Sequence, residues 1–173
     1  MRTLTVTLSW LLLVFLVWSC ASKQLPPPKL EFAKDAIKIH VKGDPQLNLS
    51  DGKPHTLLVC VYQLKDPNGL NQLAGDQDGL YRLLECSLFD ASVAGAKRLI
   101  VQPAQNTTVN FDRAEGARYV AVVAGYYLLE RERMVRLYEI PVIIEKKGII
   151  KRTKTQKLDT LEIDLKLAPQ QIE

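Results

Sequence analysis

The chain has 173 residues, with 23 Lys or Arg against 19 Asp or Glu, and its formal net charge is +4. This small positive excess excludes a phosphate-backbone binder, which needs many more cations, so the sequence predicts no nucleic-acid partner. Hydrophobic residues make up 47% and charged residues 24%, as in an ordinary globular domain, and the length fits one domain.

The first 19 residues are typical of an export signal. Arg2 gives a short positive start, and residues 10–18 form an apolar run. A membrane-spanning helix needs roughly 20 apolar residues, and Lys23 ends the run too early. We therefore expect residues 1–19 to be a signal peptide.

Residues 17–20 resemble a bacterial lipobox, in which cleavage occurs before a cysteine whose thiol receives a diacylglyceryl group. This resemblance implies a covalent lipid on Cys20 and no other cofactor. Ala21 and Ser22 follow where an inner-membrane retention signal would typically have Asp, so we expect an outer-membrane lipoprotein facing the periplasm of a Gram-negative bacterium. An ordinary secretory signal with an unmodified cysteine is the alternative.

Residues 20–35 form the expected tether. They contain three consecutive prolines, residues 26–28, which favour extended polyproline II geometry. Two or three acyl chains would anchor this segment firmly. Residues 36–173 are then the folded domain.

Seven segments of the domain predict β-strands, because they are rich in branched or aromatic residues and end at Gly, Pro, Asn or Asp. They are residues 37–42, 57–64, 98–102, 107–112, 119–127, 135–140 and 161–167. The fifth is apolar on both faces and should be central. Short strands at this spacing predict a mostly β fold, a two-sheet antiparallel sandwich.

Residues 69–94 interrupt this pattern. Their leucines recur with i, i+3, i+4 spacing, which predicts short amphipathic helices. Asp78-Gly79 is expected to separate two of them. The sandwich should therefore carry a helical insertion between its second and third strands.

The sequence offers no catalytic constellation. The chain has two histidines, His40 and His55, and neither lies near a Cys or carboxylate cluster with metal-ligand spacing. Nucleophile and phosphate-loop motifs are absent from the sequence. Residues 76–78 and 130–133 contain paired charges that fit a turn and a solvated hairpin tip. We expect no enzyme activity and no metal site.

Cys60 and Cys86 remain if Cys20 is lipidated. In an oxidising periplasm two such thiols often pair. A disulfide would connect the helical insertion to a strand, whereas two buried free cysteines are the alternative. The sequence leaves both open.

Residues 146–157 concentrate six cations: Lys146, Lys147, Lys151, Arg152, Lys154 and Lys157. One interpretation is contact with anionic headgroups or an acidic partner. The other is a solvated hairpin whose lysines protect sheet edges, and we favour it.

Residues 47–66 are similar to a diagnostic stretch of one protein family. The shared features are Leu47-Asn48, Gly52-Lys53-Pro54 and an apolar strand that ends in Tyr62-Gln63-Leu64. On these residues the chain resembles the type VI secretion outer-membrane lipoproteins, TssJ. The likeness continues through the helical insertion and into residues 117–124.

The resemblance implies a transthyretin-like sandwich that holds the periplasmic domain of TssM, the inner-membrane component found in a complex with TssL. It also implies that the loop from about Asp44 to His55 carries the partner-binding residues. These are Asn48, Ser50, Asp51, Gly52 and Lys53. A purely structural turn is the alternative for this loop. For the whole protein, the alternatives are a periplasmic ligand-binding or a secretin-pilot lipoprotein.

Overall fold

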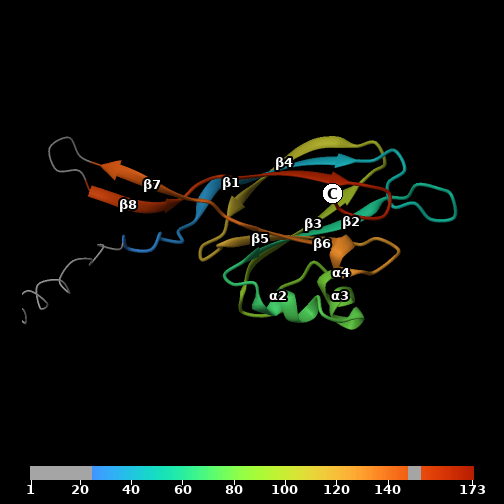
Figure 1. Ribbon diagram of the computed structural model, residues 1–173, viewed down its shortest axis with the longest axis horizontal. Helices are drawn as coiled ribbons and strands as arrows, with labels where there is room; N and C mark the ends of the chain where they lie inside the picture. Colours follow the sequence, from blue (N-terminus) through green and yellow to red (C-terminus); the bar gives the residue numbers. More distant parts are fainter. Residues whose placement is uncertain (1–24, 148–152) are drawn as a thin grey trace, which may run out of the picture.

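The computed structural model describes residues 25–147 and 153–173, which form two packed β-sheets with short helices (Figure 1). The first sheet has the strand order β4-β1-β9. Its strands are β1 (Ala33–Gly43), β4 (Asn106–Arg113) and β9 (Leu161–Leu167). The β1 strand pairs antiparallel with β4 and parallel with β9. A parallel pair is possible here because no short turn connects β1 to β9.

The second sheet is antiparallel throughout and has the order β3-β2-β5-β6. Its strands are β2 (Leu57–Leu64), β3 (Val93–Val101), β5 (Tyr119–Ala124) and β6 (Val135–Glu139). The predicted mostly β sandwich and the central position of β5 are therefore confirmed, and the parallel pair of β1 and β9 is the departure from the predicted antiparallel pairing. The β5 strand is shorter than expected, because it ends at Ala124 rather than Tyr127.

The core lies where the alternating residues of the two sheets meet. In β9, Leu161, Ile163 and Leu165 are buried while the residues between them are exposed. Ile37 and Ile39 of β1 are fully buried in the same core. Only one face of this sheet packs on the core, and side chains alternate along a strand, so the other face of β1 and β9 is polar.

Two helices cover the face of the second sheet that points away from the first sheet (Figure 1). They are α2 (Asn68–Leu73) and α3 (Gln77–Leu83), and Leu70, Leu80 and Leu83 are their buried leucines. The β2 and β5 strands are therefore covered on both faces, which explains their near-continuous burial. The predicted helical insertion between β2 and β3 is confirmed.

The break between the helices lies earlier than predicted. The Asp76 side chain caps α3 by accepting a hydrogen bond of 2.7 Å from the Gly79 amide. Gly79 thus lies inside α3, and it has a packing role: a Cβ atom there would lie 1.9 Å from the Leu73 carbonyl oxygen. The close approach of α2 requires this glycine, and the chain turns before Asp76 instead.

A one-turn helix, α4 (Arg131–Met134), replaces the expected hairpin tip between β5 and β6. Met134 anchors it because that side chain is fully buried. The C-terminal tail runs beside it: the Ile172 amide donates to the Arg133 carbonyl over 2.9 Å, and the Tyr126 hydroxyl donates to the Gln171 carbonyl over 2.7 Å. The tail follows β9 of the first sheet, so these bonds connect the two sheets.

A separate hairpin extends away from the sandwich (Figure 1). It consists of β7 (Val142–Lys147) and β8 (Thr153–Leu158), which pair antiparallel. The hairpin predicted for the basic segment is thus present. Lys151 and Arg152 lie outside the described residues.

Residues that we expected in the tether already contact the folded domain. The backbones of Lys29 and Lys157 form a parallel bridge, and the Gly116 amide donates to the Leu30 carbonyl over 2.8 Å. The Arg113 guanidinium, which is buried, donates to the Glu31 carbonyl. The β1 strand then begins at Ala33 rather than near residue 36. Prolines do not prevent this docking because the contacts use groups that follow them.

Candidate functional site

The loop from Asp44 to His55 lies at one end of the sandwich, between β1 and β2. Its first residues are fixed to both neighbours of β1. The Gly43 amide donates to the Gln105 carbonyl over 2.8 Å, and the Asp44 amide donates to the Leu167 carbonyl over 2.9 Å. The loop is therefore presented by a rigid sheet, the usual arrangement for a binding loop.

The base of the loop is part of the core. Leu47 is fully buried, and the Asn48 side chain is 6% exposed. The Asn48 amide donates to the Thr56 carbonyl over 3.0 Å, and the His55 amide donates to the Leu47 carbonyl over 2.9 Å. Asn48 also has a φ of 50°, which asparagine tolerates better than most residues. These contacts close the base of the loop.

The tip of the loop is a tight turn. The backbones of Ser50 and Lys53 exchange two hydrogen bonds, of 3.0 and 2.9 Å. Asp51 and Gly52 between them have φ values of 49° and 71°, the left-handed pair that a type I′ turn requires. Apart from Gly52 and its two chain neighbours, no atom of the described residues lies within 4 Å of the position of a Cβ at Gly52. The tip therefore projects into solvent (Figure 1).

The five predicted partner-binding residues consequently divide into two groups. Asp51, Gly52 and Lys53 are exposed at the tip, where a partner could reach them. Ser50 is half-buried, and Asn48 is buried. A partner-binding role for Asn48 requires an exposed side chain, and this expectation is wrong, because Asn48 is buried and its amide donates to the Thr56 carbonyl instead. Buried polar groups generally need such a partner.

Sequence reasoning also missed an apolar platform beside the loop. Tyr127 follows β5, and its ring meets the His55 ring edge to face, with centroids 5.6 Å apart. Tyr127 is 65% exposed, and the next residue, Leu128, is also exposed. The sequence predicts a strand that includes Tyr127, whereas β5 ends at Ala124. Gly125 was the available signal that the strand ends earlier, since glycine is common at such ends.

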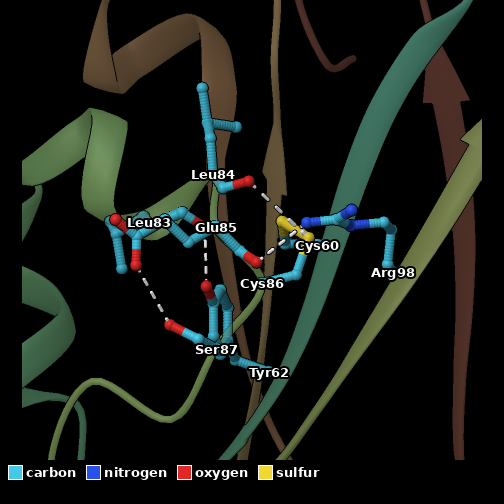
Figure 2. The surroundings of a disulfide bond; sticks show 8 residues. All are labelled: Cys60, Tyr62, Leu83, Leu84, Glu85, Cys86, Ser87 and Arg98. Atoms are coloured by element: carbon cyan, nitrogen blue, oxygen red, sulfur yellow. Dashed lines mark hydrogen bonds between the residues drawn. A yellow bond between two sulfur atoms is a disulfide. The ribbon is translucent and has the colours of Figure 1, made fainter.

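Cys60 of β2 and Cys86, which follows α3, form a disulfide in the structure (Figure 2). Their Cα atoms are 5.1 Å apart, within the usual range for such a bond. Arg98 of β3 lies beside the bond and donates to the Glu85 carbonyl over 3.0 Å. Cys86 has a φ of 54°, in the left-handed region that side chains other than Asn and Asp rarely adopt.

Tyr62 supplies a second connection between β2 and the insertion. Its hydroxyl donates to the Leu83 carbonyl over 2.6 Å (Figure 2). Burial is the main cause that raises the pKa of Tyr62 from 10.0 to about 12, because the charged form would lose its hydration. The hydroxyl therefore stays a hydrogen-bond donor through the physiological range.

Among the residues that the structure describes, no group of three or more His, Cys, Asp or Glu side chains could hold a metal ion. In the same part of the chain, no helix has the length and apolar character needed to cross a membrane. His40 lies on β1, and His55 lies in the loop before β2. Cys20, the predicted lipidation site, lies outside the described residues, as do residues 1–19 and the start of the tether.

The comparisons with known proteins identify the family. The model of the family described as "Type VI secretion lipoprotein, VasD, EvfM, TssJ" matches residues 35–167. No curated protein sequence matches the chain.

Solved structures share the fold at low sequence identity. The T6SS lipoprotein TssJ1 from Pseudomonas aeruginosa is 20% identical, with a TM-score of 0.59 over 85% of this chain and 95% of that one. Serratia marcescens Lip, a membrane-bound component of the Type VI Secretion System, is 16% identical, with a TM-score of 0.58 over 79% and 94%.

A further structure, described as the T6SS protein TssM C-terminal domain from EAEC, contains a chain that is 16% identical. Its TM-score is 0.56 over 79% of this chain and 94% of that one. The family match covers most of the domain, from Asp35 within β1 to Leu167 at the end of β9. On this evidence, the chain belongs to the type VI secretion lipoprotein family.

Proposed function

We propose that this protein is a lipid-anchored component of the outer membrane that holds the periplasmic domain of TssM, and so helps to connect the two membranes of a secretion machine. Its membership of the type VI secretion lipoprotein family supports this proposal. The family is not an enzyme family, and the protein would act by binding rather than by catalysis. A complex that also contains TssL is part of the same proposal.

The observation that carries the proposal is the geometry of the loop. A rigid base places an exposed turn, Asp51 to Lys53, at one end of the domain. The exposed side chain of Tyr127 lies beside that loop through its contact with His55, and the next residue, Leu128, is also exposed. Aromatic residues are enriched at the centres of protein interfaces, and the rims are polar, so an exposed tyrosine beside a polar turn fits a binding surface.

The test substitutes residues at the tip of the loop and leaves the base of the loop unchanged. Lys53→Glu reverses one exposed charge, and Asp51→Asn removes another while keeping a residue that tolerates the positive φ. We expect the double variant to bind the TssM periplasmic domain at least about tenfold more weakly, because charge reversal at a contact costs over a kcal/mol. Titration of immobilised protein with that domain measures the change.

Lys97→Glu is the matched control, because Lys97 is an exposed lysine on β3, outside the loop. It should bind the TssM domain like the wild type. If the double variant at the tip also binds normally, this loop is not the TssM site. Asn48 is left unchanged in this experiment because its substitution would disturb the base of the loop.

The lipid anchor has its own test. Replacing Cys20 with serine should release the protein from the outer-membrane fraction, since acylation requires the thiol. Continued sedimentation of Cys20→Ser with that fraction would refute the anchor.

A further inference from the structure

The hairpin of β7 and β8 carries a surface that the TssM proposal does not use. Side chains alternate across a strand, so Val142, Ile144 and Lys146 share one side of β7. Lys154 of β8 lies directly opposite Lys146 in the ladder, on that same side. We call these four residues the outer hairpin face. All four are exposed, with Ile144 at 57%.

The charges on this face are unbalanced. Like charges that lie directly opposite each other across a ladder repel, and Lys146 and Lys154 form such a pair. Within the part of the chain that the structure describes, neither has a carboxylate in ion-pair distance. On the other side of the hairpin, by contrast, Lys157 lies 3.4 Å from Glu145. The outer hairpin face therefore combines exposed apolar side chains with uncompensated positive charge.

The position of the hairpin indicates what could cover this face. The N-terminal segment runs along the edge of β8, where the backbone of Lys29 bridges that of Lys157. Leu25, the first described residue, follows Cys20 by five positions, and five Cα-to-Cα steps span at most roughly 18 Å. Hairpin and N-terminal segment lie at the same end of the molecule (Figure 1). A lipid on Cys20 would thus keep this hairpin close to the bilayer.

We propose that the outer hairpin face binds anionic phospholipid headgroups of the leaflet that holds the acyl chains of Cys20. Lys146 and Lys154 would contact lipid phosphates, which would relieve their mutual repulsion. Val142 and Ile144 would enter the interface beside them, the arrangement of apolar and cationic side chains found in interfacial segments. This inference rests on the lipid anchor proposed above. An acidic protein segment would satisfy the lysines but gives no reason for their proximity to the anchor.

The experiment reconstitutes the lipidated full-length mature protein into phosphatidylethanolamine vesicles that contain either phosphatidylglycerol or phosphatidylcholine. Gln156→Cys places a single thiol for an environment-sensitive fluorophore, because Gln156 lies opposite Ile144 on the same side of the hairpin. Cys60 and Cys86 are bonded to each other and should not react. With phosphatidylglycerol, we expect a blue shift and quenching by headgroup-labelled lipid. The same fluorophore on Lys53→Cys, at the loop tip, should remain in water.

A pair of charge-reversal variants separates local contact from general charge. Lys146→Glu with Lys154→Glu should reduce the quenching at least about threefold. Lys42→Glu with Lys166→Glu is the matched control: these exposed lysines also face each other, across β1 and β9, and the change in net charge is the same. The control should quench like the parent protein.

The outcomes separate a failure of the lipid anchor from a failure of the headgroup contact. Protein that does not float with the vesicles refutes the anchor, and this inference with it. Protein that floats but keeps the Gln156→Cys label in water overturns the inference alone. Equal quenching in both vesicle types, or a label that becomes shielded only when the TssM domain is added, also overturns it, and the second result would assign the face to a protein partner.

Discussion

Asn48 and Arg113 show how single buried polar residues hold the ends of this domain. The Asn48 amide closes the base of the loop on the Thr56 carbonyl. Arg113, at the end of β4, donates to the carbonyls of Glu31 and Asp159, and so connects the N-terminal segment to the turn before β9. Burial lowers the pKa of the Arg113 guanidinium, but hydrogen bonds to carbonyls offset part of the desolvation. Both residues have structural roles at the edges of functional segments.

Tyr62 gives a prediction about alkaline stability. Its pKa is 10.0 in the unfolded chain and about 12 in the folded protein, so between these values the folded state retains a proton that the unfolded state has lost. The free energy of unfolding should therefore decrease as the pH rises from 10 to 12. Tyr62→Phe should lower stability at pH 7 by about 1 kcal/mol, through loss of the bond to Leu83, and should flatten this alkaline decrease.

Urea unfolding at several pH values measures both effects. Some slope should persist in the variant, because burial also raises the pKa values of Tyr126 and Tyr138. Tyr81→Phe is the control for loss of an exposed tyrosine hydroxyl. If Tyr62→Phe shows the same stability and the same slope as Tyr81→Phe, the buried hydrogen bond to Leu83 contributes nothing measurable.

At the scale of elements, the helical insertion depends on few connections to the sheet beneath it. The disulfide at Cys86 and the hydroxyl of Tyr62 both lie at the end of α3. Both connect it to β2, which is covered by the first sheet on its other face. The insertion completes the burial of a central strand that would otherwise expose Cys60 and Tyr62. Its leucines thus stabilise the sandwich as well as the helices.

Removal of the disulfide should therefore destabilise the whole domain. The bond closes a loop with a sequence separation of 26, for which the chain-entropy model gives roughly 3 kcal/mol. We expect Cys60→Ala with Cys86→Ala to lose about that much free energy of unfolding in urea. The reduced wild-type protein should lose a similar amount, and this comparison separates the bond from the small change in packing.

Alkylation tests the bond directly. In denaturant without a reductant, neither Cys60 nor Cys86 should react, and the mass should increase by two labels only after reduction. Two labels without reduction would show that the thiols are free, and the loss of stability would then require another cause.

At the scale of the molecule, the two proposed surfaces lie at opposite ends of the long axis (Figure 1). The N-terminal segment and the β7-β8 hairpin form one end, and the loop with Asp51 and Lys53 projects from the other. The sandwich between them is held by a single core that spans both sheets. Such an arrangement would place the TssM site away from the bilayer that holds the anchor.

The two ends should therefore act independently. The hairpin variant, Lys146→Glu with Lys154→Glu, should bind the TssM domain like the wild type, and Lys53→Glu should leave the hairpin contact with vesicles unchanged. Effects of distant sites with no shared partners usually add within about 0.5 kcal/mol. Binding titrations on the combined variant check this expectation. A combined loss that clearly differs from the sum would show that the two ends are coupled.

Local patterns in the sequence determined most of the architecture. Alternation of apolar and polar residues predicted strands such as β1 and β9, because a strand has one buried face wherever only one layer covers it. The leucine spacing of residues 69–94 predicted the helices, because i, i+3, i+4 spacing places the leucines on one face of a helix that packs on the sheet. The loop tip was also visible, since Asp51-Gly52 is a typical turn pair. The family resemblance likewise depended on contiguous residues.

Contacts between distant residues decided the rest, and no local pattern encodes them. Asn48 is buried because Thr56 offers it a carbonyl, and Gly79 belongs to α3 because the backbone of Leu73 leaves no room for a side chain. The N-terminal segment docks because β8 offers an edge beside Lys157. Each outcome depends on which surfaces meet after folding, so only the tertiary structure could show which end of the domain the N-terminal segment joins and which end carries the loop.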